Sequence, residues 1–479
     1  MIPQSLTNRP RLQATTPPDD DVFRIGSGAG FAGDRHDGAE VLARFGDLDA
    51  LAFECLAERT IGIAQHRRSV GSEPGWDTRI LRRLSGTLPH LLSPQGRSDA
   101  RPSPVVTTNA GAADPAGAAR AIVDLLARED LPAVPVAAVT GDDVLDALDL
   151  RESRILGSDD TLWDIRERIV SANAYLGAGP LVDGLSQGAR IIVTGRSSDA
   201  ALFLAPLAHH HGWDLHPASV GEARLDIVAE GTLVGHLLEC AGQLTGGYFA
   251  DGVRKRVDGL ARLGFPFADV RADGSATYGK VPGTGGVLDR RTVLEQLLYE
   301  IDDPFRYPTP DVTLDLSAVE ISELADDRVL VRGGRANGVP EQLKVSVGVR
   351  DGLVATAEIG YAGFGSGIRG ELAADIIRER WAEVRGRTSE ELSIAVIGVN
   401  SSRPWFAPDL SEPPEVRVRF SVRTWERPVA EALCEEVEAL YTNGPYGGGG
   451  VTTQIRETIG IVSTLIPRDL ASPSVEVLS

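Results

Sequence analysis

The chain has 479 residues, of which 42% are apolar and 24% are charged, a composition typical of globular rather than disordered proteins. Its formal net charge of −20 disfavours a nucleic-acid partner, because such a surface repels a phosphodiester backbone at long range. No stretch approaches the roughly 20 uncharged apolar residues that a membrane-spanning helix needs, so no membrane span is expected.

Residues 1–21 are rich in Pro, Thr and Asp and lack the apolar core of a signal peptide. We therefore expect them to form a flexible leader on a cytoplasmic protein. The cysteines, Cys55, Cys240 and Cys434, are odd in number and far apart in the sequence. Neither a disulfide framework nor a cysteine-ligated metal site is predicted from them.

Strand and helix patterns alternate through residues 22–305, which predicts a Rossmann-like α/β lobe built on a parallel sheet. The predicted strands cover residues 22–25, 48–56, 105–108, 134–140 and 189–193. Ligands of such sheets bind where the carboxyl ends of the strands meet the following loops. This rule is expected to gather five residues at one rim of the lobe: Gly28, Glu54, Asn109, Asp142 and Arg196.

The pattern changes near residue 306, and residues 306–468 are predicted to form a smaller, mixed α+β lobe. Its expected strands cover residues 313–316, 328–332, 344–349, 353–359, 392–399 and 416–423. A turn at residues 350–352 is expected to separate two of these strands, because Asp-Gly favours hairpin turns. Helices are expected over residues 369–384 and 428–441, and residues 469–479 are expected to form a loose tail.

A glycine-rich turn follows the first predicted strand. Gly28, Gly30 and Gly33 match the pattern G-x-G-x-x-G before a helix. Glu54 follows Gly33 by 21 residues, which is the sequence spacing of the carboxylate that binds a ribose hydroxyl in dinucleotide folds. The pattern predicts an anion or nucleotide site, whereas a tight strand–helix turn that needs glycine for packing is the alternative. Asp34 and Arg35 directly follow the turn, and a carboxylate at that place would repel a pyrophosphate.

Glu54 and Glu58 flank Cys55, and Arg59 comes next. Two carboxyl groups at a strand exit can divide general acid and general base roles if their pKa values are pushed apart. The other interpretation is a surface charge cluster of little consequence. Cys55 is expected to be a buried structural thiol.

Further polar clusters accompany later glycines. Glu239, Gln243, Thr245 and Gly246 form one cluster that either orients a substrate or caps a helix. Three other segments are candidates for ligand binding or hinge motion: the loop around Gly285, the pair Arg196 and Asp199, and the loop of residues 447–450. Residues 209–211 are three consecutive histidines, which point in different directions, so a solvated helix end is favoured over a metal site.

Ordered sequence blocks over most of the chain resemble the acyclic terpene utilisation protein AtuA family. The blocks are residues 24–35 (RIGSGAGFAGDR), 53–60 (FECLAERT), 195–199 (GRSSD), 243–247 (QLTGG), 283–286 (GTGG), 295–300 (EQLLYE) and 443–445 (NGP). The resemblance implies a link to the breakdown of acyclic terpenoids and branched acids, which are handled as CoA thioesters. It brings no established mechanism. Some relatives carry a further small C-terminal domain, which implies a separate small partner subunit here.

The leading functional hypothesis is an enzyme that acts on a branched or unsaturated acyl-CoA or related carboxylic acid, by hydration, dehydration or carbon–carbon cleavage. The catalytic candidates are Asp34, Glu54, Glu58 and Glu239. The candidates for ligand binding are Gly28, Gly30, Gly33, Arg35, Arg59, Asn109, Arg196, Asp199, Gln243, Thr245, Gly246 and Gly285. No metal and no separate cofactor is predicted beyond the CoA part of the substrate, and the expected assembly is a homo-oligomer. The alternatives are a nicotinamide-dependent oxidoreductase and a non-catalytic, ligand-binding scaffold.

Overall fold

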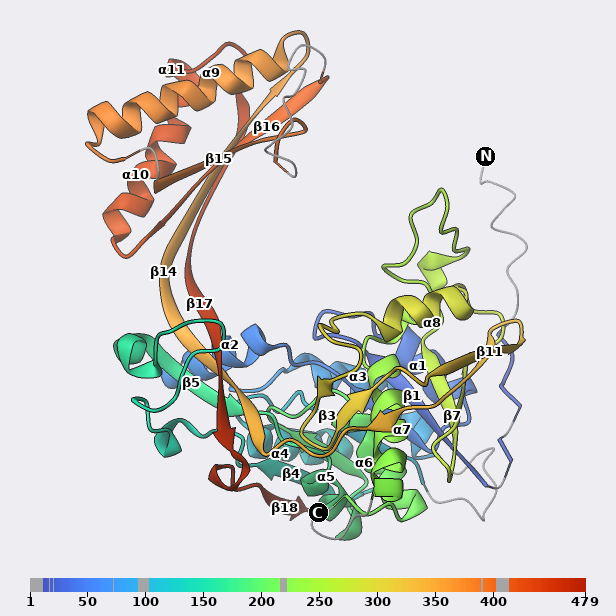
Figure 1. Ribbon diagram of the computed structural model, residues 1–479. Coiled ribbons are helices and arrows are strands. Elements are labelled where there is room, and N and C mark those ends of the chain that lie inside the picture. Colours follow the sequence, from blue (N-terminus) through green and yellow to red (C-terminus); the bar gives the residue numbers. More distant parts are fainter. Residues whose placement is uncertain are drawn as a thin grey trace. The chain divides into compact units, whose positions relative to one another are not determined.

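The computed structural model describes residues 12–16, 18–19, 21–71, 73–93, 103–215, 222–388, 391–401 and 413–479. The chain divides into two compact units (Figure 1). Unit 1 contains residues 1–348 and 461–479, and unit 2 contains residues 349–460. None of the described helices combines the length and apolarity needed to cross a bilayer.

Unit 1 is a mixed α/β structure with a sheet of ten strands. In spatial order the strands are β11 (Glu320–Ala325), β12 (Arg328–Arg332), β8 (Ala276–Lys280), β7 (Pro266–Arg271), β1 (Val22–Ala29), β2 (Ala50–Phe53), β3 (Val105–Thr108), β6 (Ile191–Thr194), β4 (Val136–Thr140) and β18 (Ser474–Leu478). The pairs from β1 through β2, β3 and β6 to β4 are parallel. The strands on both sides of this parallel segment pair antiparallel.

Helices pack in two groups against the parallel segment. One group is α1 (Asp37–Phe45), α3 (Arg79–Leu91) and α4 (Pro115–Arg128), whose apolar faces share a buried core with the strands. The other group, whose neighbouring members contact one another, is α5 (Gly179–Ser186), α6 (Ala201–His211) and α7 (Glu222–Leu238). All eight residues of α6 from Ala201 to Ala208 are buried, which explains its nearly continuous apolar sequence. The described remainder of unit 1 includes α2 (Glu58–Ser69), α8 (Arg290–Leu297), β5 (Ile169–Ala174), β9 (Tyr307–Pro308), β10 (Thr313–Asp315) and β13 (Arg335–Ala336).

Unit 2 is built on a sheet in the order β15-β16-β14-β17, in which β15 and β14 each pair antiparallel with β16, and β5 also pairs with β14. A β-α-β-β-α-β chain path generates this order. Its elements are β14 (Gln342–Ala362) from residue 349 on, α9 (Ser366–Glu379) with a π-helical turn at Arg380–Val384, β15 (Leu392–Ile397), β16 (Glu415–Thr424), α10 (Arg427–Glu438), α11 (Leu440–Asn443) and β17 (Gly449–Pro467) up to residue 460. Trp381, Phe420 and Leu433 belong to one buried core between the helices and the sheet. This order and path are those of the split β-α-β, or ferredoxin-like, arrangement.

Three expectations from the sequence differ from this structure. The compact units divide at residues 348 and 460 rather than at 305, because β11 and β12 pair with the large sheet of unit 1. The expected tail contains β18, which pairs with β4. Residues 350–352 are not a hairpin turn, because β14 runs continuously through them and Gly352 adopts a φ of +76° within the strand.

Part of the expected leader is also ordered. Residues 1–11, 17 and 20 lie outside the described residues. Within the described part, the Thr15 hydroxyl donates a hydrogen bond of 2.9 Å to the Gly46 carbonyl and is only 8% exposed. The segment around Thr15 is therefore packed against the end of α1.

The glycines near the end of β1 are explained by close packing. Gly28 lies inside the strand, where a Cβ would come within 2.5 Å of the Phe53 ring. A Cβ on Gly30 would lie 2.6 Å from the backbone carbonyl carbon of Cys240. A Cβ on Gly33 would instead meet the Phe31 ring, whose side chain is 58% exposed and free to turn away. Gly30 and Gly33 therefore differ in how much an added methyl group should lower the free energy of unfolding.

We expect Gly30→Ala to lower the free energy of unfolding by about 2 kcal/mol, because backbone cannot move aside as a side chain can. Gly33→Ala is the matched control and should change stability by less than about 1 kcal/mol. Chemical denaturation followed by circular dichroism measures both values. Equal losses for the two variants would contradict this account of the turn.

Candidate functional site

The order of the parallel strands reverses once, between β3 and β6. The chain passes from β3 through α4 to β4, and β6 then returns to lie between β3 and β4. The helices that follow β3 and β6 belong to different packing groups, so the loops after these two neighbouring strands lead away to opposite faces. Such a reversal of strand order is where open α/β sheets bind ligands. Asn109 follows β3 and Arg196 lies two residues after β6.

Glu54 follows β2 and is hydrogen-bonded to the loop after β3. Its Oε1 accepts from the Asn109 side-chain amide at 3.0 Å and from the Leu56 backbone amide at 2.8 Å. Asn109 in turn accepts a hydrogen bond of 2.7 Å from the Cys55 amide, so its orientation is fixed. Burial, followed by repulsion from Asp199, raises the pKa of Glu54 to about 8 and outweighs the attraction of Arg196. Glu54 is therefore protonated at neutral pH.

Arg196 is 1% exposed and ties several loops together. Its Nε and Nη2 donate to the Ser197 carbonyl at 2.9 and 2.7 Å, and the guanidinium also bonds the Leu56 carbonyl and the Asp199 carboxylate. The guanidinium carbon lies 4.4 Å from the centre of the Tyr175 ring. Because these partners engage both ends of the guanidinium, Arg196 positions the site rather than presenting an open fork to a ligand.

Asp142, which follows β4, supports the backbone beneath Arg196. Its Oδ2 accepts from the Arg196 backbone amide at 2.8 Å and from the Asn173 side chain at 2.9 Å. Burial raises the pKa of Asp142 to about 6, although these hydrogen bonds act in the opposite direction.

Glu58, in the first turn of α2, has the opposite electrostatic environment to Glu54. It accepts a hydrogen bond of 2.5 Å from the Tyr175 hydroxyl and one of 2.6 Å from the Lys344 ammonium. Partial desolvation acts to raise the pKa of Glu58, but the hydrogen bonds from Lys344 and Tyr175 outweigh it and hold the pKa below its ordinary value. Glu58 is ionised at neutral pH and only partly exposed, so the structure holds one neutral and one charged carboxyl group in the same region.

A buried histidine–carboxyl pair lies next to these groups. His236 Nδ1 is 3.2 Å from Glu239 Oε1, and its Nε2 is 3.1 Å from the Leu297 carbonyl. Burial and repulsion from Asp199 and Glu300 raise the pKa of Glu239, against the attraction of His236. The Asp199 carboxylate repels both Glu239 and Glu54, so the His236–Glu239 pair lies in the same region as Glu54.

The glycine-rich turn after β1 is occupied by its own side chains. Asp34 Oδ2 accepts from the Gly30 amide at 3.0 Å, and the Arg35 guanidinium donates to the Leu263 and Ala261 carbonyls. The Arg83 guanidinium donates to the Asp34 carbonyl and so ties the turn to α3. The backbone amide that a pyrophosphate would need and the Glu54 carboxyl that a ribose would need are thus both engaged. In addition β1 pairs antiparallel with β7, where a dinucleotide fold has a second parallel half. This geometry does not favour a nicotinamide site.

The other predicted residues are placed as follows. Thr245 is fully buried, and its hydroxyl donates to the Gly264 carbonyl at 2.7 Å. Gly246 has a φ of +103°, and Gly285 packs against the Gly259 carbonyl. These three residues therefore build a region of tight turns. Gln243 faces Tyr299, and Arg59 is exposed on α2. The Phe23 and His210 rings lie 4.6 Å apart, and the His211 and Trp213 rings stack at 5.2 Å. Across the described residues, no group of three or more potential ligands is arranged to hold a metal ion.

Sequence reasoning missed Tyr175, Lys344 and His236. Tyr175, the residue after β5, and Lys344, in β14, both contact Glu58, and no local sequence pattern connects either of them to α2. A signal for Lys344 was available, because the whole chain contains only three lysines, at positions 255, 280 and 344. His236 lies three residues before Glu239, which is the helical spacing for a contact between their side chains.

The raised pKa of Glu54 predicts a pH-dependent loss of stability. Between the ordinary value of 4.5 and the folded value of about 8, the folded protein holds a proton that the unfolded chain releases, so rising pH favours unfolding. Glu54→Gln keeps the acceptor oxygen and cannot ionise. We expect this variant to match the wild type near pH 5 and to be more stable above pH 8, by a few kcal/mol at ~1.4 kcal/mol per pKa unit.

Thermal melts of both proteins across this pH range measure the difference. Glu152→Gln, at an exposed position, is the control and should follow the wild-type curve. Parallel curves for the wild type and Glu54→Gln would show that Glu54 is ionised in the folded protein.

Comparison with known proteins identifies the family. The model of the family described as "Acyclic terpene utilisation family protein AtuA" matches residues 23–477, nearly the whole chain. No curated protein and no solved structure matches the chain. The match extends across both compact units, so it covers the residues around Glu54 and Arg196 as well as the β-α-β-β-α-β unit. The chain belongs to the acyclic terpene utilisation AtuA family.

Proposed function

We propose that this protein is a cytoplasmic hydratase or dehydratase of a branched or unsaturated acyl-CoA. The observation that carries the proposal is the opposite pKa shift of Glu54 and Glu58, which provides a proton donor and a proton acceptor at neutral pH. Both carboxyl groups interact with Arg196 and Asp199, so they act within one electrostatic environment. Membership of the AtuA family supports a substrate from acyclic terpene utilisation.

In dehydration, the Glu58 carboxylate removes a proton from the carbon next to the thioester carbonyl. The C–O bond to the hydroxyl group on the next carbon breaks, and protonated Glu54 donates its proton so that the hydroxyl leaves as water. Glu54 becomes a carboxylate, which Arg196 stabilises by its charge, and hydration is the same sequence reversed. Tyr175 holds the Glu58 carboxylate through its hydroxyl. Cleavage of a carbon–carbon bond by the same two groups is the other reaction of this class.

The charge of the site favours a thioester over a free acid. Repulsion from Asp199 acts to raise the pKa of both Glu54 and Glu239, and repulsion from Glu58 and Glu300 acts to raise the pKa of Asp199, so several carboxyl groups lie close together here. A free carboxylate would be repelled by these carboxyl groups, whereas a thioester carbonyl and its conjugated double bond are neutral.

The proposal does not use the glycine-rich turn to hold phosphate, because Asp34 already accepts a hydrogen bond from the Gly30 amide. We further infer that the parallel segment is a Rossmann-like half sheet whose crevice between β3 and β6 receives the acyl group.

The direct test is dehydration of branched acyl-CoA esters that carry a hydroxyl group on the carbon β to the thioester carbonyl, followed by the gain of the enoyl-thioester absorbance. We expect Glu54→Gln and Glu58→Gln each to lower kcat by roughly 100-fold or more, because each removes one proton-transfer group. Glu73→Gln, on the surface after α2, should retain wild-type turnover. Turnover by Glu54→Gln and Glu58→Gln at the wild-type rate would exclude the proposed roles, and no turnover by the wild type on any such ester would exclude the substrate class.

The pH profile gives an independent test of the proton donor. Because Glu54 must be protonated in the dehydration direction, kcat/KM for dehydration should fall as pH rises through about 8. The acid limb should lie below the ordinary range of a glutamate, since the pKa of Glu58 is lowered. An alkaline limb that stays unchanged in Glu54→Asp, whose shorter side chain alters the burial of the carboxyl, would assign the limb to another group.

A further inference from the structure

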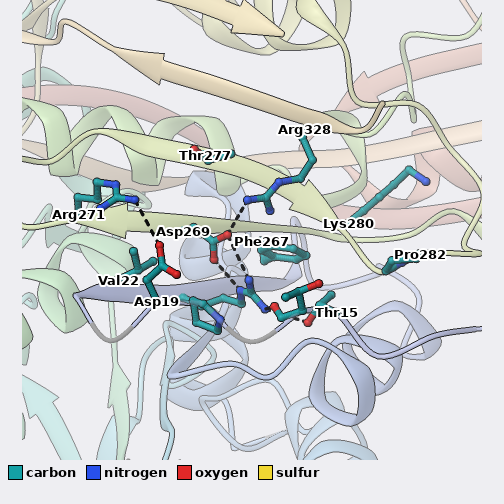
Figure 2. A pocket seen from close by; sticks show the side chains of 13 residues that line it. Thr15, Asp19, Val22, Phe267, Asp269, Arg271, Thr277, Lys280, Pro282 and Arg328 are labelled. Carbon is teal, nitrogen blue, oxygen red and sulfur yellow. Dashed lines mark hydrogen bonds and ion pairs between the residues drawn. The ribbon is translucent and has the colours of Figure 1, made fainter. Parts of the chain in front are cut away.

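A cavity of about 410 Å³ lies on unit 1, and neither Glu54 nor Arg196 lines it (Figure 2). Its floor is formed by the antiparallel strands β1, β7, β8 and β12, and one side is formed by the segment around Thr15 and Asp19. The lining contains none of the residues assigned above to the candidate site. Its volume lies in the range of small-molecule sites, which is about 300–1,000 Å³.

Two guanidinium groups in this cavity share one carboxylate. Asp269 accepts from Arg24 Nε at 2.6 Å and Nη2 at 3.2 Å, and from Arg328 Nη2 at 2.8 Å. Figure 2 shows Arg328 and Asp269 pointing toward each other beside the Phe267 ring. The centre of the cavity therefore carries one positive charge more than its carboxylate neutralises. This excess stands out in a chain with a formal net charge of −20.

The other charged groups leave this excess in place. Lys280 is paired with Asp327 at 2.8 Å, with its side chain 4% exposed. Arg271, at the edge, pairs with Asp19 and Asp21, whose side chains are 79% and 68% exposed. Water screens such exposed carboxylates strongly, so they compensate little for a charge deeper in the cavity.

The two guanidinium groups are held in place before any ligand arrives. Arg24 is 3% exposed and also donates to the Thr15 hydroxyl and to the Gly46 carbonyl. The Arg24 and Arg328 guanidinium carbons lie 4.5 and 5.8 Å from the centre of the Phe267 ring. Arg328 keeps 36% of its side-chain surface exposed, so its planar fork is open on the cavity side.

We propose that this cavity binds the phosphate group of a phosphorylated small molecule, with Arg328 as the residue that contacts it. A phosphate dianion satisfies a preorganised guanidinium fork and balances the unneutralised charge. Pro18, which is half-buried, and Pro282, which is exposed, line the same cavity and offer an apolar surface for the organic part of the ligand. This inference goes beyond the proposed acyl-CoA chemistry and does not rest on it, because it uses a different set of residues.

The test is calorimetric titration of the full-length protein with inorganic pyrophosphate at constant ionic strength. The wild type should bind in the millimolar range or tighter. Arg328→Gln should weaken binding at least tenfold, because one charge-assisted contact is lost, a loss equal to ~1.4 kcal/mol. Arg332→Gln is the matched control on the same strand: Arg332 pairs with the exposed Glu320 and does not line the cavity, so binding should be unchanged.

A second variant keeps every charge and fills the cavity. Thr277 lines it from β8, and Thr277→Phe should abolish binding by occupying the space. Binding by Arg328→Gln or by Thr277→Phe at the wild-type affinity would overturn the proposal, as would no binding by the wild type at millimolar pyrophosphate. If Arg328→Gln does not fold, as judged by circular dichroism, Thr277→Phe alone decides.

Discussion

The buried guanidinium of Arg196 is the interaction on which the candidate site depends. A charged group that is 1% exposed is tolerated only when its hydrogen-bonding groups are satisfied, and here the partners come from separate parts of the chain. The Leu56 carbonyl belongs to the loop after β2, and Asp199 lies at the start of the α6 region. Satisfying one arginine therefore fixes the β2–α2 connection, which carries Glu54 and leads into Glu58, against the segment after β6.

The same arginine explains why two glutamates four residues apart behave differently. Both are attracted by its charge, but Glu54 is almost fully buried and faces Asp199, so the cost of desolvating its charge prevails. Glu58 retains partial exposure and receives donors from Tyr175 and Lys344. The division into a neutral and a charged carboxyl group thus follows from exposure and from hydrogen-bond donors, with the same residue type at both positions.

Much of the parallel segment could be predicted from the sequence, and less of what surrounds it. The range of β3 followed from the alternation of strands and helices, and the convergence of Asn109 and Glu54 followed from the strand-end rule. The contact of Lys344 with Glu58 joins residues 286 positions apart, and no local pattern encodes it. Likewise, the sequences of β11 and β12 indicate strands but do not indicate which sheet these strands join. For this reason the sequence placed the boundary near residue 305, whereas the compact units divide at residues 348 and 460. The glycines of the turn fit the alternative given for them, close packing, since a Cβ on Gly30 would meet the Cys240 backbone.

The way in which unit 2 is connected has a consequence for the history of the chain. β14 and β17 are adjacent in its sheet, and a Cβ on Gly460 would lie 3.3 Å from the Val349 side chain, so the two ends of the unit meet. A segment whose ends meet can be gained or lost within a host loop at little cost in loop-closure entropy. The β-α-β-β-α-β unit therefore has the form of an insertion within the α/β unit, whose last strand, β18, can pair with β4 only after the inserted residues have been synthesised.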